Sequence, residues 1–334
     1  MGSSLNSIRE AQPDGDKSLS LEFLFNSVDF SFVWKVVMMK YHLRGRSHDP
    51  VAMFKALLLK EMRQLSSRRK LVEFLKRDTF WLKKCGFQNP PSHNSFSDFV
   101  DRVGADATEQ LFYYLVEQIR GLKSVGELIA VDSTPLKGYA HFWKDRECSD
   151  PDAKWGYSPT TEWVFGYKAH LAVDAESELP LAFTVTPANI YDSTEYPKIV
   201  ELLMQKGLQP KTILADAGYD SKENYRLALK HGAVPIIAIN KRNLKKKGSR
   251  HFEQDLPIQR NSELWKNLYR KRSSAERVIS RLKEELALKD IKVRGLDNVR
   301  IHVAFSLIAM LTVALVAFKT GNGNRATSVN SFRF

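Results

Sequence analysis

Hydrophobic residues recur every three or four positions through the first third of the chain, from about Leu21 to Leu122. This spacing predicts a series of amphipathic helices. Asp49 and Pro50 suit the cap and the first turn of one helix, and the next helix begins within the basic run Ser66 to Lys76. We therefore expect a helical domain over residues 21–125, after a disordered leader over residues 1–20.

The pattern changes at Glu127, where short apolar runs replace the helical spacing. Five segments predict strands: ELIAVDSTPL, WVFGYKAHLAVD, LPLAFTVTPAN, TILADAGYD and VPIIAIN. Helical runs around residues 194–206 and 222–231 separate the last three. The order β-β-β-α-β-α-β predicts an α/β domain with a mixed sheet flanked by helices. We place this domain at residues 126–320, with an insertion at about 240–262.

The segment that follows the insertion predicts a helix with two faces. At about 100° per residue, its polar residues fall in one stripe: Tyr269, Arg272, Glu276 and Lys283. A neighbouring stripe has core-facing spacing: Leu264, Leu268, Ala275, Ile279, Leu282 and Leu286. Taken alone, the polar stripe fits either a solvated face with ion pairs or one wall of a site for a metal ion and a polyanion.

The run from Val303 to Phe318 is the one candidate for a membrane span. Its sixteen apolar residues fall short of the roughly 20 that a span usually needs. We therefore predict a buried core helix and no membrane partner. Residues 321–334 contain no sustained pattern, and we expect a disordered tail.

Charge narrows the choice of partner. The 51 Lys and Arg against 38 Asp and Glu give a net charge of +13, spread through the chain. Such an excess favours nucleic acid or an anionic surface as partner, and short helices with basic edges are typical of DNA-binding modules. Each of those helices could equally serve only for packing. Cys85 and Cys148 lie far apart, which excludes a zinc cluster or a disulfide framework and fits the cytoplasm.

Two of the predicted strands end in a carboxylate, at Asp132 and Asp216. Strand ends at one edge of a sheet are where α/β proteins place their sites, although a lone Asp there usually serves a turn. With Glu276 on the following helix, three oxygen donors would suit Mg²⁺ or Mn²⁺, and two ions would suit phosphoryl displacement. Asp220 is a rival for the second position, but it follows the turn AGY.

These residues carry a resemblance. Tyr269-x2-Arg272-x3-Glu276-x6-Lys283 resembles the Tyr-Arg-Glu-Lys signature of DDE transposases from bacterial insertion sequences, and AVDSTPLKG and ADAGYDS resemble their two aspartate motifs. The similarity covers roughly residues 20–320, including the helical segment and the final apolar helix. It implies a ribonuclease-H-like core, DNA cleavage at transposon ends, and strand transfer by the freed 3′-hydroxyl without a covalent protein–DNA intermediate.

The resemblance also implies roles for single residues. The metal-binding catalytic triad would be Asp132, Asp216 and Glu276, holding Mg²⁺ or Mn²⁺ as two ions. DNA near the cut would be contacted by Tyr269, Arg272 and Lys283. The partners would be double-stranded DNA, as terminal inverted repeats and target, and a second copy of the chain in a synapsed homodimer. We expect a cytoplasmic, nucleoid-associated protein.

A basic run lies in the insertion, and we expect it to bind DNA phosphates rather than only to aid solubility. Its DNA-binding candidates are Lys241, Arg242, Lys245, Lys246 and Lys247. Only 60 positions (276 minus 216) separate the second and third acids. The insertion is therefore short, which puts in doubt the hairpin-forming cleavage associated with relatives that carry a larger one.

Some polar and aromatic residues keep two interpretations. Lys168 and His170 alternate along one strand, so they could point toward the site or simply form a surface face. The tryptophans Trp143, Trp155 and Trp163 could stack on an unpaired base, but ordinary packing is the simpler interpretation. Two rival functions also stay open: an inactive DNA-binding remnant or regulator with the same fold, and a cellular metal-dependent nuclease or phosphatase.

Overall fold

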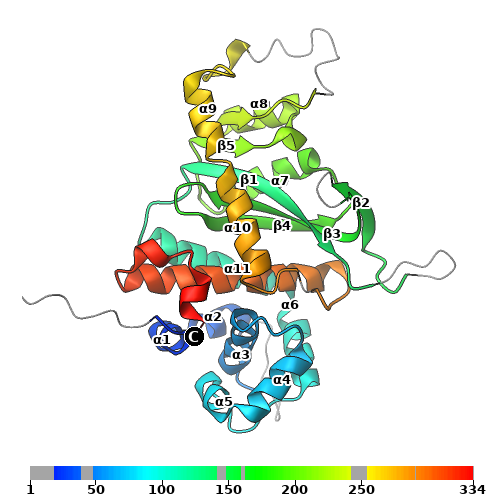
Figure 1. Ribbon diagram of the computed structural model, residues 1–334, viewed down its shortest axis with the longest axis vertical. Coiled ribbons are helices and arrows are strands. Elements are labelled where there is room, and N and C mark those ends of the chain that lie inside the picture. Colours follow the sequence, from blue (N-terminus) through cyan, green and yellow to red (C-terminus); the bar gives the residue numbers. More distant parts are fainter. Residues whose placement is uncertain are drawn as a thin grey trace, which may run out of the picture.

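The first part of the chain is helical, as predicted (Figure 1). A computed structural model describes residues 19–38, 48–140, 148–158, 162–241, 254–289 and 291–333. Its helices before the sheet are α1 (Leu21–Ser27), α2 (Phe32–Val37), α3 (Pro50–Met62), α4 (Arg68–Arg77), α5 (Thr79–Cys85) and α6 (His93–Arg120). Polar residues cap most of them; for example, Asp49 accepts a hydrogen bond from the backbone N–H of Ala52 at the start of α3.

A six-stranded mixed sheet follows. Its strands are β1 (Leu128–Lys137), β2 (Lys154–Ser158), β3 (Glu162–Asp174), β4 (Leu179–Pro187), β5 (Thr212–Ala215) and β6 (Val234–Ile237). The strands β4, β3 and β1 pair antiparallel, whereas β5 and β6 continue beyond β1 in parallel. The short strand β2 pairs with the first part of β3. This is the predicted ribonuclease-H-like mixed sheet.

Helices cover the sheet and connect its parallel strands. They are α7 (Asp192–Gln205), the 3-10 turn η1 (Ala217–Tyr219), α8 (Lys222–Lys230), α9 (Glu263–Arg270), α10 (Ser273–Glu284) and α11 (Leu296–Lys319). Helix α10 crosses one face of the sheet over β1 and β3, and α3 to α5 gather at the end of the molecule opposite α8 and α9 (Figure 1). The sheet and the N-terminal helices meet along α6 and α11, because α11 packs against both α6 and β4.

Helix α11 forms the centre of the hydrophobic core. It is long and apolar enough to cross a membrane, but 89% of its most apolar window is buried inside the protein. It packs against α6, α3 and β4, so it belongs to both domains at once. A polar contact joins it to α3, because Ser306 Oγ donates to Glu61 Oε2 over 3.1 Å. This placement agrees with the predicted core helix.

The prediction of a disordered tail from residue 321 is wrong. The 3-10 turns η4 (Gly323–Arg325) and η5 (Val329–Phe332) follow α11, and both Val329 and Phe332 have 0% exposed surface. The turn η5 contacts α1 and α11. Arg333 donates to the carbonyl oxygens of Met62 and Glu285. Burial of two large apolar side chains offsets the entropy of ordering this short segment.

Phe332→Ala should therefore destabilise the protein, although only two residues follow it in the sequence. Loss of a fully buried phenyl ring typically costs about 3 kcal/mol in the free energy of unfolding. Guanidinium denaturation would measure this loss, with Asn330→Ala as the exposed control expected to change little. Equal stability of the two variants would contradict the observed burial of the tail.

Candidate active site

The register of the parallel strands places two predicted acids side by side. Val131 of β1 pairs with Ala215 of β5, so Asp132 and Asp216 occupy the next step along the two strands. The prediction that both strands end there holds only for β5, because β1 runs on to Lys137 in its antiparallel pairing with β3. Because β5 ends at Ala215, Asp132 has no strand partner on that side, and space is left there for a site.

Local hydrogen bonds fix both carboxylates. Asp132 Oδ1 accepts from the backbone N–H of its neighbour Ser133 over 2.8 Å. Asp216 caps the turn η1, because its Oδ1 accepts from the N–H of Gly218 over 2.8 Å. The rival Asp220 is 6% exposed, and its Oδ2 accepts from the N–H of Asn240. Asp220 thus ties the turn to the end of β6, and Asp216 faces the site.

The polar stripe after the insertion reaches the same acids. Arg272 lies 3.6 Å from Asp132 Oδ2 and donates to Glu276 Oε1 over 2.6 Å. Its guanidinium also lies over the ring of Tyr269, which stacks on Trp265. Burial lowers the pKa of Lys283, and the charge of Asp132 acts on it in the opposite direction. The structure therefore brings the four signature residues and the two aspartates together.

The signature helix is divided into α9 and α10, which differs from the single predicted helix. Hydrogen bonds between residues three apart join them, such as Ala275 N–H to the carbonyl of Arg272. Such 3-10 steps turn the chain by about 120° per residue, so the apolar face changes direction. Leu264 is consequently 56% exposed, against prediction. The other predicted core residues pack inward: Leu268, Ala275, Ile279, Leu282 and Leu286.

Burial and mutual repulsion make the carboxylates hard to ionise. Burial raises the pKa of Asp132 to about 7, with further contributions from the charges of Asp216 and Glu276; the Ser133 N–H and Arg272 oppose the rise. The pKa of Asp216 is also raised by burial and by nearby acids. A cation bound between these acids would remove the repulsion, so the electrostatics favour a metal site.

Asp132→Asn should stabilise the metal-free protein at about pH 8, because it removes a charge that folding buries. The pKa of Asp132 is higher in the folded protein, so the wild type loses stability as the pH rises from 3.8 through about 7. At about pH 5 the folded carboxyl is protonated and the difference between the two proteins should shrink. Denaturation at both pH values tests this, and a difference independent of pH would contradict it.

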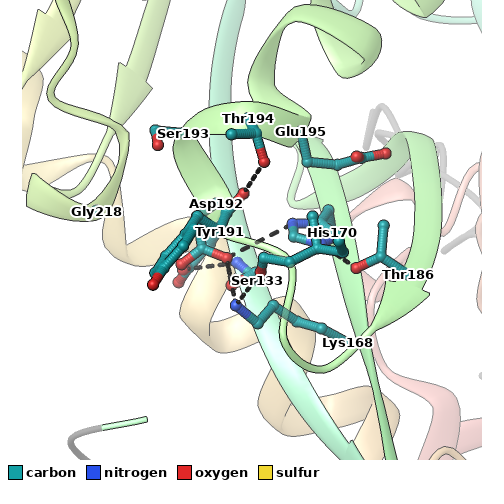
Figure 2. A network of polar contacts seen from close by, with 12 residues as sticks. Ser133, Lys168, His170, Thr186, Tyr191, Asp192, Ser193, Thr194, Glu195 and Gly218 are labelled. Atoms are coloured by element: carbon teal, nitrogen blue, oxygen red, sulfur yellow. Dashed lines mark hydrogen bonds and ion pairs between the residues drawn. The ribbon is translucent and has the colours of Figure 1, made fainter. Parts of the chain in front are cut away.

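A third aspartate, Asp192, completes the site, and sequence reasoning missed it. It is the first residue of α7, and its Oδ1 accepts from Ser133 Oγ and from Lys168 Nζ, each over 2.9 Å (Figure 2). A Cβ on Gly218 would lie 3.0 Å from Asp216 Oδ1 and 3.3 Å from Asp192 Oδ2. The two carboxylates therefore face each other across this glycine. The sequence around it is ANIYDS, just before a predicted helix. An Asp in that position usually indicates only a helix cap, so Asp192 did not stand out as a site residue.

Lys168 and His170 point toward Asp192 and do not form a surface face (Figure 2). His170 has no exposed surface, and its Nε2 shares a hydrogen bond with Thr186 Oγ1 over 3.0 Å. Burial lowers the pKa of His170 to about 4, so the ring is neutral at physiological pH. Lys168 thus supplies the positive charge that offsets Asp192.

Lys168→Met should cost about 1 to 3 kcal/mol in the free energy of unfolding, because it leaves Asp192 without its cation. The side chains of this pair are only 12% and 24% exposed. Lys211→Met is the matched control, since Lys211 and Glu127 form a pair of the same length, 2.9 Å, with 73% and 60% exposure. Surface pairs typically contribute below about 1 kcal/mol. Equal losses in denaturation experiments would show that burial does not strengthen the Lys168 pair.

The basic insertion is only partly described. Lys241 is exposed just after β6, and Arg242, Lys245, Lys246 and Lys247 lie outside the described residues. Among the tryptophans, Trp143 also lies outside them. Trp155 and Trp163 are 45% and 66% exposed on β2 and β3, so core packing is the wrong interpretation for both. Cross-strand pairing places them in one exposed aromatic row with Tyr157.

The site thus belongs to an α/β domain whose mixed sheet carries acids at one edge, with cations on the helix above. The chain belongs to the Transposase DDE domain family, whose profile matches residues 123–312. A second profile, Transposase domain (DUF772), matches residues 6–102. The family assignment supports a transposase and the DDE class.

Individual relatives agree with this family. A protein of Halobacterium salinarum assigned as the transposase of insertion sequence element ISH11 is 25% identical, over 84% of this chain and 83% of its own length. One of Burkholderia cepacia, assigned to element IS402, is 34% identical over 25% of this chain and 43% of its own. The piggyBac transposase synaptic complex with hairpin DNA reaches a TM-score of 0.47 at 12% identity, over 95% of this chain and 77% of that chain, too weak a likeness to define the fold.

Proposed function

We propose that this protein cuts DNA at the ends of an insertion sequence and joins the freed 3′-hydroxyl ends to target DNA. Asp132, Asp216 and Glu276 would form the catalytic triad. The observation that carries the proposal is the convergence of the β1 and β5 aspartates with the cations of α10. A carboxylate group flanked by Arg272 and Lys283 suits a reaction at a phosphodiester, where metal ions and phosphates must be bound together.

The donor set fits Mg²⁺ or Mn²⁺. All candidate ligands are carboxylate oxygens, which hard divalent cations prefer. Among the described residues no three acids, histidines or cysteines stand close enough to share an ion, and Glu276 is bound to Arg272. Glu276 is 52% exposed on its side chain, so we expect it to leave Arg272 and join the aspartates. When bound, two ions would activate the attacking oxygen and stabilise the leaving one.

The signature cations would then be available for DNA. Arg272 would exchange Glu276 for a phosphate, and its planar guanidinium suits bidentate contact with phosphate oxygens. The Tyr269 ring lies 5.6 Å from the Arg272 guanidinium, and Lys283 lies in the last turn of α10. This row matches the Tyr-Arg-Glu-Lys signature, and we propose that it grips the backbone on both sides of the cut. The resemblance to DDE transposases, which act on paired ends, leads us to propose a homodimer on DNA.

Asp216→Asn should bind a duplex carrying the end of its own element and fail to cut it. Loss of a metal ligand removes several kcal/mol of transition-state stabilisation, so cutting should fall by about a thousandfold or more. A mobility shift measures binding of the duplex, and cleavage of the end-labelled duplex in Mg²⁺ measures cutting. Chelation of divalent ions by EDTA should stop cutting by the wild type.

Asp220→Asn is the matched control, because Asp220 lies four residues on and serves the β6 contact. It should retain cutting, at some cost in stability. If the wild type and Asp216→Asn cut equally well, the assignment of Asp216 to the catalytic triad would be wrong. If the wild type binds the ends and never cuts them, the inactive DNA-binding remnant becomes the better assignment.

A further inference from the structure

A groove lies away from the acidic site, between the helical domain and the segment that follows α10. Its volume is about 650 Å³. It is bounded by the first turns of α4 and α6 on one side, and by Lys292, Tyr139 and the start of α11 on the other. Residues more than 200 positions apart in the sequence therefore line one space.

The groove is positively charged. Five of its lining residues are Lys or Arg, and Glu61 is the acid among them: Lys60, Arg68, Arg69, Lys70 and Lys292. Lys60 is bound to Glu61 over 2.7 Å, Lys70 to Glu73 over 2.9 Å, and Arg68 donates to Ser97 Oγ. Arg69 and Lys292 are exposed and form no ion pair with a described residue. These two cations are available for an external anion.

Neutral groups in the groove also suit phosphate oxygens. Residues in the first turns of α4 and α6 line the groove, and helix N-termini favour anions. Tyr139 is 44% exposed and lies under Lys292 and Arg294, whose charged groups are 5.6 and 5.0 Å from its ring. The contact with Tyr139 holds Lys292 beside another residue that lines the groove.

The groove lies at the far end of the helix that carries the signature. Helix α10 begins next to Arg272 and runs down across the sheet toward α11 and the helical domain (Figure 1). Lys283 lies in its last turn, and Lys292 follows nine positions later in the chain. Arg272, Lys283 and Lys292 therefore follow one another along the chain from the acidic site to the groove.

We propose that this groove binds the phosphodiester backbone of the same duplex that is cut at the acidic site, so that both domains of one chain hold one DNA molecule. The proposal rests on the proposed function. A duplex presents one negative charge per roughly 1.7 Å, which matches an extended row of cations better than a compact anion would. Arg69 and Lys292 would contact phosphates some distance from the cut, from opposite walls of the groove.

The test is a double variant, Arg69→Ala with Lys292→Ala, in the full chain. Its probe is a duplex of about 40 base pairs that carries one end of the surrounding element, measured by fluorescence anisotropy at several salt concentrations. Each lost phosphate contact lowers the slope of log affinity against log salt by about 0.9, so the slope should fall by nearly 2. Affinity near physiological salt should fall about tenfold.

The matched control is Lys222→Ala with Lys230→Ala, which removes the same charge from exposed positions on α8 at the opposite end of the molecule (Figure 1). It should keep the wild-type slope. If the two double variants lost the same DNA affinity and slope, the proposed DNA binding by the groove would be overturned, because the change in net charge alone would explain both losses. If the Arg69→Ala with Lys292→Ala variant kept the wild-type slope of log affinity against log salt, DNA binding by the groove would be ruled out. The proposed function would still stand if cutting depended on Asp216. Absence of any DNA binding by the wild type would overturn both.

Discussion

The parallel pairing of β1 with β5 is the constraint on which the site depends. It fixes two carboxylates at neighbouring positions, an arrangement that their mutual repulsion opposes. Strand hydrogen bonds and the buried apolar side chains of β1 hold the backbone rigid, so Asp132 and Asp216 cannot move apart to relieve the repulsion. The stability of the sheet thus maintains a concentration of negative charge that isolated side chains in water would not keep, and that charge attracts divalent cations.

Two neighbouring cations, Lys168 and Arg272, balance this negative charge in different ways. The Lys168 side chain is only 12% exposed, is bound to Asp192 and is held by the strand β3, so it is a permanent part of the site. Arg272 lies between Asp132 and a largely exposed Glu276, so its bonds are exchangeable. The difference lies in the partner carboxylates: Asp192 is 24% exposed, whereas Glu276 is 52% exposed and can leave Arg272 for water or a metal ion at little cost. The fixed cation maintains the fold, and the exchangeable one can respond to DNA.

Local patterns were sufficient for much of the site and of the fold. Asp132 and Asp216 follow apolar runs, and the signature residues have helical spacing, so adjacent sequence carries their signal. Asp192 has no such pattern, and only the packing of α7 against β3 brings it to Lys168. Val329 and the rest of η5 form a segment too short for periodicity, and its order depends on contacts with distant helices. Asp192 and the ordered tail could therefore not be predicted, because their placement depends on contacts with distant segments and no local pattern marks them.

The position of α11 has a mechanical consequence. Because this helix packs against α3 and α6 of the helical domain and against β4 of the sheet, the two domains share one core and cannot swing independently. The separation between the acids at the β1–β5 edge and the groove beside α4 is then a fixed length of the protein. With a duplex held at both places, that length would act as a ruler, setting the number of base pairs between the point of grip and the severed bond without reading the intervening sequence.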